Sequence, residues 1–484
     1  MNPYFQNQSC DPFTPQMTPC ELGNYASYSI NITSPKHVVA AIEFCREHNV
    51  RLVIKNTGHD FLGKSTGKGA LSLWTRNLKT SKFIKRYKSD KYKGPAMKLG
   101  AGVTAYEALE AAYSTGHRTV GGDCPTVGIS GGYTQGGGHS PLTSAYGMAA
   151  DQALEWELIT AAGQHLIATP TKNADLYWAL SGGGPGTFAI VLAVTVKVYP
   201  EGPMGTAMLS FNGSTVDHET YLSAMDGWWM ALPDIVDSGA TVIWSVSSDG
   251  FAFRMLNAPD KTANQVAAMM DPFLRRLANL GVNYVFVPGQ TSSYYEHYNQ
   301  TMGPLPYGSW PASMLFNSRM VPRAVAESDQ GRSKLTAAMH AIVMNKTVAP
   351  WSFGCSAFNV RNISHPANAV ASYWRDAIAL CNSISLWDWT IPRSEMLARK
   401  VYLAEAIAAK VEAVTPGSGA YLNEVDSFMY PPNSLRWQED LYGSNYAKLR
   451  SIKDKWDPDS IFYAHTAVGS EDWLVDDIGR LCRN

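Results

Sequence analysis

The stretch 119-TVGGDCPTVGISGGYTQGGGHS-140 decides how this chain is expected to fold. It holds Cys124 in a turn crowded with glycine, and 51-RLVIKNTGHDFLGKSTG-67 holds His59 in a similar setting. Glycine lets a backbone approach a ligand closely and supplies positive φ where a tight loop needs it. Taken alone, each residue is most simply a buried cysteine or a satisfied loop histidine. Two such residues in two such loops instead suggest a flavin held at two points.

Length and composition indicate the number of lobes and exclude some classes of partner. A chain of 484 residues exceeds the usual size of one core, so two large lobes are expected. The hydrophobic fraction of 45% and the charged fraction of 17% are ordinary for a globular protein. A net charge of −1 argues against nucleic acid as a partner and against electrostatic docking to a membrane. No apolar run is long enough to span a bilayer.

Strands and helices alternate over the first part of the chain. The strand expected at residues 50–54 runs directly into the glycine turn 55–58, where backbone N–H groups can face a pyrophosphate. A helix capped by Thr104 follows another strand, and a strand is expected at 189–198. This alternation predicts an α+β flavin domain that extends to about residue 205.

The pattern changes after residue 205. Helical periodicity marks residues 261–280, 324–344, 366–382 and 394–414, and strand-like runs mark residues 239–247, 252–256, 352–360 and 420–425. These segments favour a substrate lobe with an antiparallel sheet backed by helices. A helix at 445–457, stopped by Pro458, is expected to return to the flavin lobe.

Several motifs occur along the chain in an order typical of one family. They are Lys55-Asn56-Thr57-Gly58-His59-Asp60, Gly122-Asp123-Cys124-Pro125-Thr126-Val127-Gly128, Gly131-Gly132, Gly136-Gly137-Gly138, the run 181-SGGGPGTF-188, Tyr421-Leu422-Asn423, Asn445-Tyr446 and Trp456-Asp457-Pro458. Through them the chain resembles the berberine-bridge-enzyme-like branch of the vanillyl-alcohol-oxidase superfamily of FAD-linked oxidases. One departure is His139, which follows Gly138 where many relatives have another residue and then glycine.

The resemblance implies an α+β, two-lobed fold. It assigns residues 1–205, completed by 435–484, to a PCMH-type FAD-binding domain and residues 206–434 to the substrate domain. It implies FAD linked through its 8α-methyl carbon to His59 and through ring carbon 6 to Cys124. Such bonds prevent loss of the cofactor and raise its potential. The expected cofactor-binding residues are Lys55, Asn56, Thr57, Gly58, His59, Asp60, Gly122, Cys124, Val127, Gly128, Gly131, Gly132, Gly138, Ile190, Asn445 and Tyr446.

The resemblance also places a polar strand over the flavin, at residues 421–426. Alternation along a strand puts Tyr421 and Asn423 on one face and Glu424 with Asp426 on the other. We therefore predict Tyr421 as the base and Asn423 as its orienting partner, with Glu424 as the next candidate. Ordinary sheet positions are the alternative interpretation. In the cysteine loop, Tyr133 and Gln135 are candidates for lining the pocket.

Three functions follow from the resemblance. The first is an oxidase, expected to be a monomer, that takes a hydride from an alcohol or secondary-metabolite substrate and passes the electrons to O₂, giving H₂O₂. The others are an oligosaccharide oxidase and a non-redox cyclase or isomerase. A Rossmann dehydrogenase is disfavoured because no G-x-G-x-x-G opens a helix after the first strand. No metal site is expected, because the histidines lack ligand spacing and most are expected at the surface: His37, His48, His117, His139, His165 and His297.

Sequons and cysteines favour the secretory pathway. Six sequons occur, at Asn7, Asn31, Asn212, Asn299, Asn345 and Asn362. Without Cys124, six cysteines remain for three disulfides of unknown pairing: Cys10, Cys20, Cys45, Cys355, Cys381 and Cys482. Six buried thiols in an intracellular enzyme are the alternative. The first residues lead into polar sequence rather than a signal peptide, and we expect that a signal has been removed.

Overall fold

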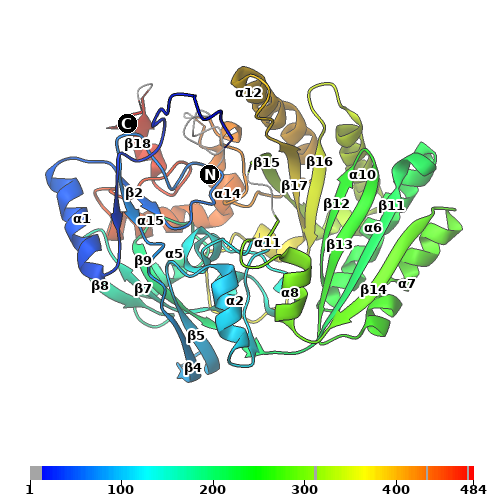
Figure 1. The fold of residues 1–484 in the computed structure, drawn as a ribbon, viewed down its shortest axis with the longest axis horizontal. Helices are drawn as coiled ribbons and strands as arrows, with labels where there is room; N and C mark the ends of the chain where they lie inside the picture. Colours follow the sequence, from blue (N-terminus) through cyan, green and yellow to red (C-terminus); the bar gives the residue numbers. More distant parts are fainter. Residues whose placement is uncertain (1–12, 310–312, 432–433, 477–478) are drawn as a thin grey trace.

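The computed structural model describes residues 13–309, 313–431, 434–476 and 479–484, arranged as two lobes (Figure 1). The lobe on the left contains the beginning and the end of the chain, and the lobe on the right contains the middle. The mixed helix and sheet architecture confirms the predicted α+β class. None of the helices within the described ranges is long and apolar enough to cross a membrane.

The first lobe is built on two sheets. A parallel three-stranded sheet has the order β1 (Tyr28–Asn31), β3 (Leu71–Trp74) and β2 (Leu52–Lys55). An antiparallel five-stranded sheet has the order β4 (Ser81–Lys88), β5 (Lys93–Gly100), β9 (Ile190–Lys197), β7 (Ala153–Ile159) and β8 (His165–Ala168). Two small pairs are β6 (His117–Arg118) with β10 (Tyr199–Pro200), and β18 (Trp473–Val475) with β19 (Leu481–Arg483).

The helices of this lobe pack around these sheets. They are α1 (Pro35–Glu47), α2 (Ala105–Tyr113), α3 (Thr143–Tyr146), α4 (Ala149–Gln152), α5 (Ala174–Leu180), α14 (Arg436–Tyr442) and α15 (Tyr446–Trp456). The cap predicted at Thr104 is confirmed, because its side chain accepts from the Glu107 N–H while Glu107 accepts from the Thr104 N–H. Trp437 and Leu449 of the C-terminal helices share one apolar cluster with Trp156, so the end of the chain completes the core of the first lobe.

The second lobe is an antiparallel seven-stranded sheet. Its order is β14 (Tyr284–Thr291), β11 (Met204–Asn212), β13 (Gly250–Pro259), β12 (Thr241–Ser247), β16 (Ser352–Ala357), β17 (Ala377–Leu386) and β15 (Met314–Pro322). Its helices are α6 (His218–Asp237), α7 (Ala263–Asn279), α8 (Tyr294–Met302), α9 (Arg323–Glu327), α10 (Asp329–Met344), α11 (Tyr373–Asp376), α12 (Arg393–Tyr402) and α13 (Ala408–Ala413). Side chains of α6, α7 and α10 bury one face of the sheet in a large apolar core, which leaves the other face toward the first lobe (Figure 1).

The helix predicted at residues 366–382 is wrong. Only the short α11 lies there, and the chain then enters β17, which pairs with β15 on one side and β16 on the other. Cys355 and Cys381 stand opposite each other in that pairing and form a disulfide. Alanine-rich sequence suits a helix locally, but hydrogen bonds to two neighbouring strands decide the conformation.

The prediction of three disulfides is met only in part. Cys20 is disulfide-bonded, but Cys45 and Cys482 are free, the former buried and the latter exposed. Burial raises the pKa of the Cys45 thiol to about 11, so this thiol is unreactive. Cys10 and the sequon Asn7 lie outside the described residues.

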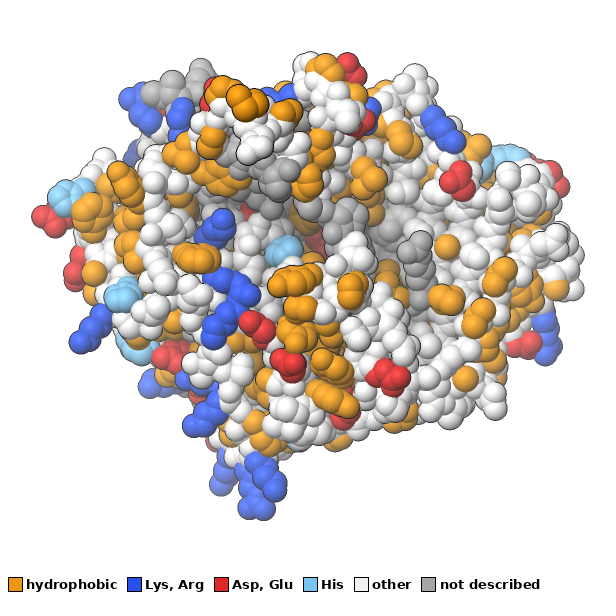
Figure 2. Space-filling view, in the orientation of Figure 1, with side chains coloured by type: hydrophobic (Ala, Val, Ile, Leu, Met, Phe, Trp, Pro, Cys, Tyr) orange, Lys and Arg blue, Asp and Glu red, His pale blue; other side chains and the backbone are white. Residues whose placement is uncertain are grey.

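The face in Figure 2 is hollowed near its centre, where the two lobes meet. Basic side chains gather at its lower left, on the hairpin of β4 and β5. Exposed basic residues of this hairpin include Lys82, Lys85, Arg86, Lys88 and Lys93. The surface is therefore locally basic at this hairpin, although the total charge of the chain is close to zero.

Candidate cofactor-binding and active site

A cavity of about 640 Å³ lies between the lobes, within the size range of small-molecule sites. One side is formed by the loop that holds His59 (the histidine loop, residues 56–65) and by the loop that holds Cys124 (the cysteine loop, residues 122–139). The segments 421–424 and 462–464 and the free face of the seven-stranded sheet also line it. The sequence motifs and the substrate lobe thus meet at one place.

Asn56 joins the two loops. A Cβ on Gly128 would lie 2.5 Å from Asn56 Nδ2, and one on Gly131 would lie 2.9 Å from the same atom. Asn56 Nδ2 donates to the Ala101 carbonyl at 2.5 Å, and the Thr57 hydroxyl accepts from the Gly128 N–H at 3.4 Å. The two glycines are therefore needed for the loops to pack together.

His59 and Cys124 converge on one hydroxyl. His59 Nε2 lies 2.8 Å from Thr126 Oγ1, and Cys124 Sγ lies 3.5 Å from the same oxygen. Gly58, with φ of +81°, supplies the turn just before His59 and lines the cavity with it. Two predicted attachment residues are thus neighbours in space, although 65 positions of sequence separate them.

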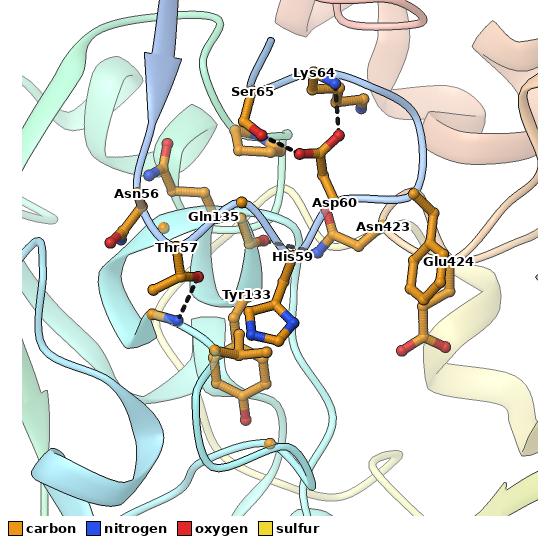
Figure 3. Close-up of a pocket in the computed structure, with 18 of the residues that line it drawn as sticks. Asn56, Thr57, His59, Asp60, Lys64, Ser65, Tyr133, Gln135, Asn423 and Glu424 are labelled. Atoms are coloured by element: carbon orange, nitrogen blue, oxygen red, sulfur yellow. Dashed lines mark hydrogen bonds between the residues drawn. The ribbon is translucent and has the colours of Figure 1, made fainter. Parts of the chain in front are cut away.

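The imidazole of His59 is neutral at neutral pH. Its ring is open to the cavity, but protein surrounds the cavity, and this burial lowers the pKa of His59 to about 4 against a weaker opposing effect of Asp60. Asp60 is held by the Lys64 N–H at 2.6 Å and by the Ser65 hydroxyl, as Figure 3 shows. A neutral ring keeps a nitrogen lone pair available to form a bond with carbon.

Polar atoms along the cavity fit an oxygen- and nitrogen-rich cofactor such as FAD. Asn56 Oδ1, Lys64 Nζ and Gln135 Oε1 are buried and have no hydrogen-bond partner within the described ranges. Burial lowers the pKa of Lys64 to about 8, opposed by Asp60. Buried polar groups are rarely left unpaired, so a ligand with complementary donors and acceptors is expected beside them.

The cysteine loop also receives a side chain from the far end of the chain. Asn423 Nδ2 donates to the Gly132 carbonyl and to the Tyr421 hydroxyl, each at 2.7 Å. A Cβ on Gly136 would lie 2.4 Å from Asn423 Nδ2. Glycine at position 136 is therefore what lets Asn423 enter the loop. Burial raises the pKa of Tyr421 well above its usual value, so its phenol stays protonated.

Glu424 is bound at both carboxylate oxygens. His139 Nε2 lies 3.0 Å from Oε1, and Asn382 Nδ2 donates to Oε2 at 3.3 Å. Burial lowers the pKa of His139, but the charges of Glu424 and Asp123 outweigh it and raise the pKa to about 9. His139 is consequently a cation at neutral pH and forms an ion pair with Glu424. Burial, partly offset by His139, raises the pKa of Asp123 to about 6.

The strand predicted at residues 420–425 is wrong. The segment is a turn in which the Glu424 N–H donates to the Tyr421 carbonyl at 2.8 Å, so side chains do not alternate between two faces. Tyr421, Asn423 and Glu424 all line the cavity. Asp426 instead pairs with the buried Lys400, away from the cavity. Glu424 is thus as well placed to meet a substrate as Tyr421.

The wall opposite the loops is the free face of the seven-stranded sheet (the sheet wall). Its strand residues that line the cavity are Ile243, Met314, Phe316, Gly354, Ser356, Asn382 and Ile384. Phe61 of the histidine loop stacks on Phe316, with ring centroids 4.8 Å apart and planes 11° apart. The sheet wall is therefore mainly apolar, and an aromatic pair links it to the first lobe.

Most of the predicted cofactor residues line this cavity: Asn56, Thr57, Gly58, His59, Asp60, Gly122, Cys124, Val127, Gly128, Gly131 and Gly132. The remaining five do not line it. Ile190 is buried in another core, between the cavity residues Ala189 and Val191. Asn445 donates to the Ala369 and Val370 carbonyls, and Tyr446 donates to Glu471. Lys55 ends β2, and Gly138 lies in the cysteine loop with φ of +70°.

Sequence reasoning missed several residues of the site. His139 was expected at the surface but is half-buried against Glu424, and His297, also expected there, is buried and bonded to Asn257. The position of His139 directly after the glycine triplet was a usable signal. Asn382 fell in the segment predicted as a helix, and no local pattern marked it. The predicted lining residues Tyr133 and Gln135 do line the cavity.

Comparison with known proteins agrees with this geometry. Residues 26–169 match the family described as FAD binding domain, and residues 420–469 match the family described as berberine and berberine like. The FAD-linked oxidoreductase orf1 of Neocamarosporium betae is 52% identical over 100% of this chain and 82% of that protein. The bifunctional decalin synthase calF of Penicillium decumbens is 48% identical over 100% of this chain and 83% of that protein.

Solved structures share the fold. The VAO-type flavoprotein MtVAO615 of Myceliophthora thermophila is 48% identical, with a TM-score of 0.95 over 100% of this chain and 87% of that one. A glucooligosaccharide oxidase of Acremonium strictum, described as carrying 6-S-cysteinyl, 8α-N1-histidyl FAD, is 18% identical. Its TM-score is 0.74 over 93% of each chain, which shows the fold alone. Because a 52% identical relative matches the whole of this chain over 82% of that protein's length, the chain belongs to the berberine-bridge-enzyme-like, vanillyl-alcohol-oxidase-type family of FAD-linked oxidoreductases.

Proposed function

We propose that this protein is an FAD-dependent oxidase whose flavin is bonded to His59 at the 8α-methyl carbon and to Cys124 at ring carbon 6. The observation that carries the proposal is the convergence of both side chains on Thr126, at 2.8 and 3.5 Å. Carbon 6 belongs to the ring that carries the 8α-methyl group, so the protein partners of these two carbons need to be close neighbours. FAD bound here would supply a hydride acceptor for an alcohol substrate, with O₂ as the final electron acceptor and H₂O₂ as its product.

The hydrogen bond of His59 favours one of its two nitrogens for the link. Nε2 contacts Thr126, whereas Nδ1 makes no hydrogen bond within the described part of the chain. Because the ring is neutral above pH about 4, Nδ1 is free to carry the bond to carbon. Thr126 fixes the ring orientation for that bond.

Glu424 is the proposed acceptor of the substrate hydroxyl proton. Tyr421, predicted first for this role, has a pKa raised by burial and is better suited to donate a hydrogen bond. Glu424 lines the same cavity and is oriented at both oxygens by His139 and Asn382. Tyr421 and Asn423 then act together to hold the turn against the cysteine loop.

The covalent links are tested by acid precipitation. Wild-type protein should keep its flavin in the pellet. The single variants His59→Ala and Cys124→Ala should each keep it through the other residue, and the double variant should release it. Thr126→Val, which removes the shared hydroxyl, is expected to slow attachment without preventing it. Free FAD in the wild-type supernatant would contradict the proposal, and peroxide release on addition of alcohols would support the oxidase chemistry.

A second candidate is a non-redox ring closure or isomerisation. The apolar sheet wall and the 48% identity with a bifunctional decalin synthase favour it. Product formation under strict anaerobiosis, with the flavin absorbance unchanged, would establish this function instead of oxidation. An oligosaccharide oxidase is less favoured, because the sheet wall offers few partners for sugar hydroxyls.

We also propose that the protein is secreted. The sequon residues Asn31, Asn212, Asn299 and Asn362 are exposed, Asn345 is half-buried, and Cys355 is disulfide-bonded to Cys381. Exposure is what glycosylation requires, and a disulfide is usual in an oxidising compartment.

A further inference from the structure

Gly354 occupies the interior of a strand, a position where glycine is unusual. It lies within β16, where it pairs with Ser245 of β12 and Asn382 of β17. Glycine weakens a strand, because it loses more backbone freedom on folding and packs no side chain. In strands it often marks a position where a ligand comes close to the backbone.

The space above Gly354 is open to the cavity. An added Cβ would lie 2.9 Å from Ile384 Cδ1, and, apart from the two residues next to Gly354 in the chain, no other heavy atom of the described residues would lie within 4 Å of it. Gly354 and Ile384 both line the cavity. The missing side chain therefore forms a shallow groove in the sheet wall, with the end of Ile384 at one side.

The groove is bounded by apolar side chains. Ile243, Met314 and Phe316 extend the sheet wall around Gly354 and Ile384, and the Phe61 ring lies flat on Phe316. Flat apolar surfaces of this kind pack well against aromatic or fused-ring ligands. Sugars, by contrast, carry hydroxyls that each need a partner, and the polar side chains of the sheet wall are Ser356 and Asn382.

One acceptor lies beside the groove. Asn382 is paired with Gly354 across the sheet, and its Nδ2 donates to Glu424. Its Oδ1 is buried and has no hydrogen-bond partner in the described ranges. A ligand with an O–H group over Gly354 would satisfy this oxygen next to Glu424, the proposed proton acceptor.

We propose that the sheet wall binds a flat, largely apolar ring system over Gly354, and that a single hydroxyl of this ligand donates to Asn382 Oδ1. This inference rests on the proposed oxidase function, which it deepens by naming the substrate class. Gly354 is then the residue that sets the ring size accepted, and Asn382 is the residue that holds the hydroxyl beside Glu424. For oxidation, the O–H rotates from Asn382 Oδ1 to the Glu424 carboxylate, which takes the proton as the hydride leaves.

Anaerobic calorimetric titration of the flavin-loaded protein, with its flavin first reduced by dithionite, tests the proposal without turnover. The probes are benzyl alcohol, naphthylmethanol, anthrylmethanol, methylanthracene and cellobiose. The dissociation constant should fall with each added ring and should be about tenfold higher for methylanthracene than for anthrylmethanol, because only the alcohol pairs with Asn382. Cellobiose should give no measurable binding. Equal affinity for cellobiose and the aryl alcohols would overturn the proposal.

Variants locate the groove. Gly354→Ala should raise the dissociation constant of anthrylmethanol at least about tenfold, because the methyl group fills the groove, and should change that of benzyl alcohol little. Gly289→Ala, in β14 of the same sheet and outside the cavity, is the matched control and should bind as wild type does. An unchanged affinity of Gly354→Ala for anthrylmethanol would refute the assignment.

A double variant separates groove filling from strain. Gly354→Ala/Ile384→Val removes the Cδ1 atom that the new methyl group meets but keeps the groove filled. It should retain the weak binding of anthrylmethanol, and recovery of wild-type affinity would argue against the groove. If wild-type protein binds the aryl alcohols but none of them reduces its flavin, the oxidase proposal fails while the binding site stands.

Discussion

Nε2 of His139 lies 3.0 Å from Oε1 of Glu424, although the two residues are 285 positions apart in the chain. His139 follows the glycine triplet of the first lobe, and Glu424 belongs to the C-terminal segment. Asn382, from the seven-stranded sheet, holds the other carboxylate oxygen. Three distant parts of the sequence therefore determine the orientation of one carboxylate in the cavity.

Replacing His139 by glutamine should slow flavin reduction by roughly tenfold to a hundredfold. A charge-assisted hydrogen bond contributes about 1.5–3 kcal/mol, and glutamine keeps a donor but removes the charge. The wild-type rate should likewise fall as pH rises through about 9, because His139 then loses its proton and its charge. The groups that face this imidazole are Glu424, Asp123 and the Tyr421 ring. Stopped-flow reduction across this pH range should show no such step in His139→Gln.

The matched control for this variant is His165→Gln. His165 also contacts a glutamate, with Nε2 2.8 Å from Glu157 Oε1, but this pair is at the surface. Its loss should leave both the rate and its pH profile unchanged. A step near pH 9 that persists in His139→Gln would assign the titration to another group.

The same ion pair gives a pH-dependent stability. The pKa of His139 is raised from about 6.5 in the unfolded chain to about 9 in the fold. Its contribution is therefore fully present below pH about 6.5 and is lost as pH rises through about 9. The difference in Tm between wild type and His139→Gln should be largest near pH 6 and should shrink above pH 9.

Glu424→Gln should slow flavin reduction by about 10²–10⁴, because it removes the proposed proton acceptor while keeping the shape of the side chain. Tyr421→Phe should have a smaller effect, since the phenol is protonated and serves mainly as a partner of Asn423. Rapid-mixing reduction of both variants measures this. The reverse ranking would return the role of base to Tyr421. Covalent flavin should be retained in both.

Gly136→Ala should weaken both flavin loading and the fold. Its Cβ would lie 2.4 Å from Asn423 Nδ2, and overpacking of this kind costs about 1–3 kcal/mol. Denaturant titration and the ratio of flavin to protein absorbance measure the two effects. Gly121→Ala is the control nearby, because its Cβ would meet only Ile129 and Ala105, at 3.6 and 3.7 Å. Equal losses of flavin loading and stability in both variants would mean that any added side chain in this region is destabilising, whether or not it meets Asn423.

Protein made in a eukaryotic secretory host should carry N-linked glycans on the exposed sequons Asn31, Asn212, Asn299 and Asn362. Mass spectrometry before and after glycosidase treatment gives the occupancy, and titration of thiols in the denatured protein gives the disulfides. An unchanged mass, together with free thiols at Cys355 and Cys381, would favour the intracellular alternative.

Local signals predicted the fold where the sequence itself determines the structure. The cap at Thr104 and the strand that leads into the glycine turn at residue 55 depend on residues a few positions apart, and both are present. The strand β17 could not be found this way, because its conformation depends on pairing with β15 and β16. Its alanine-rich sequence favours a helix when it is considered alone.

The residues of the site likewise fall into those that a sequence motif predicted and those that it did not. The family motifs predicted that His59 and Cys124 act at one site, and both residues line the same cavity. Asn382 was not predicted, because its place in the site is defined by a contact with Glu424 rather than by a sequence pattern. His139 was marked by its position after the glycine triplet, but its contact with Glu424 could not be read from the sequence. The assumption of a strand at Tyr421 then assigned Glu424 to the wrong side, because period-two alternation does not hold in a turn.

The insertion of Asn423 beside Gly136 has a consequence for biosynthesis. The bond from Asn423 to the Gly132 carbonyl joins residues 291 positions apart, so the cysteine loop is completed only by a segment near the end of the chain. A ribosome must synthesise the chain past residue 423 before that segment can fold back onto the first lobe. The site for the flavin is therefore completed only once residue 423 has been synthesised, and nascent chains that stop before residue 420 should be unable to retain the cofactor in the first lobe.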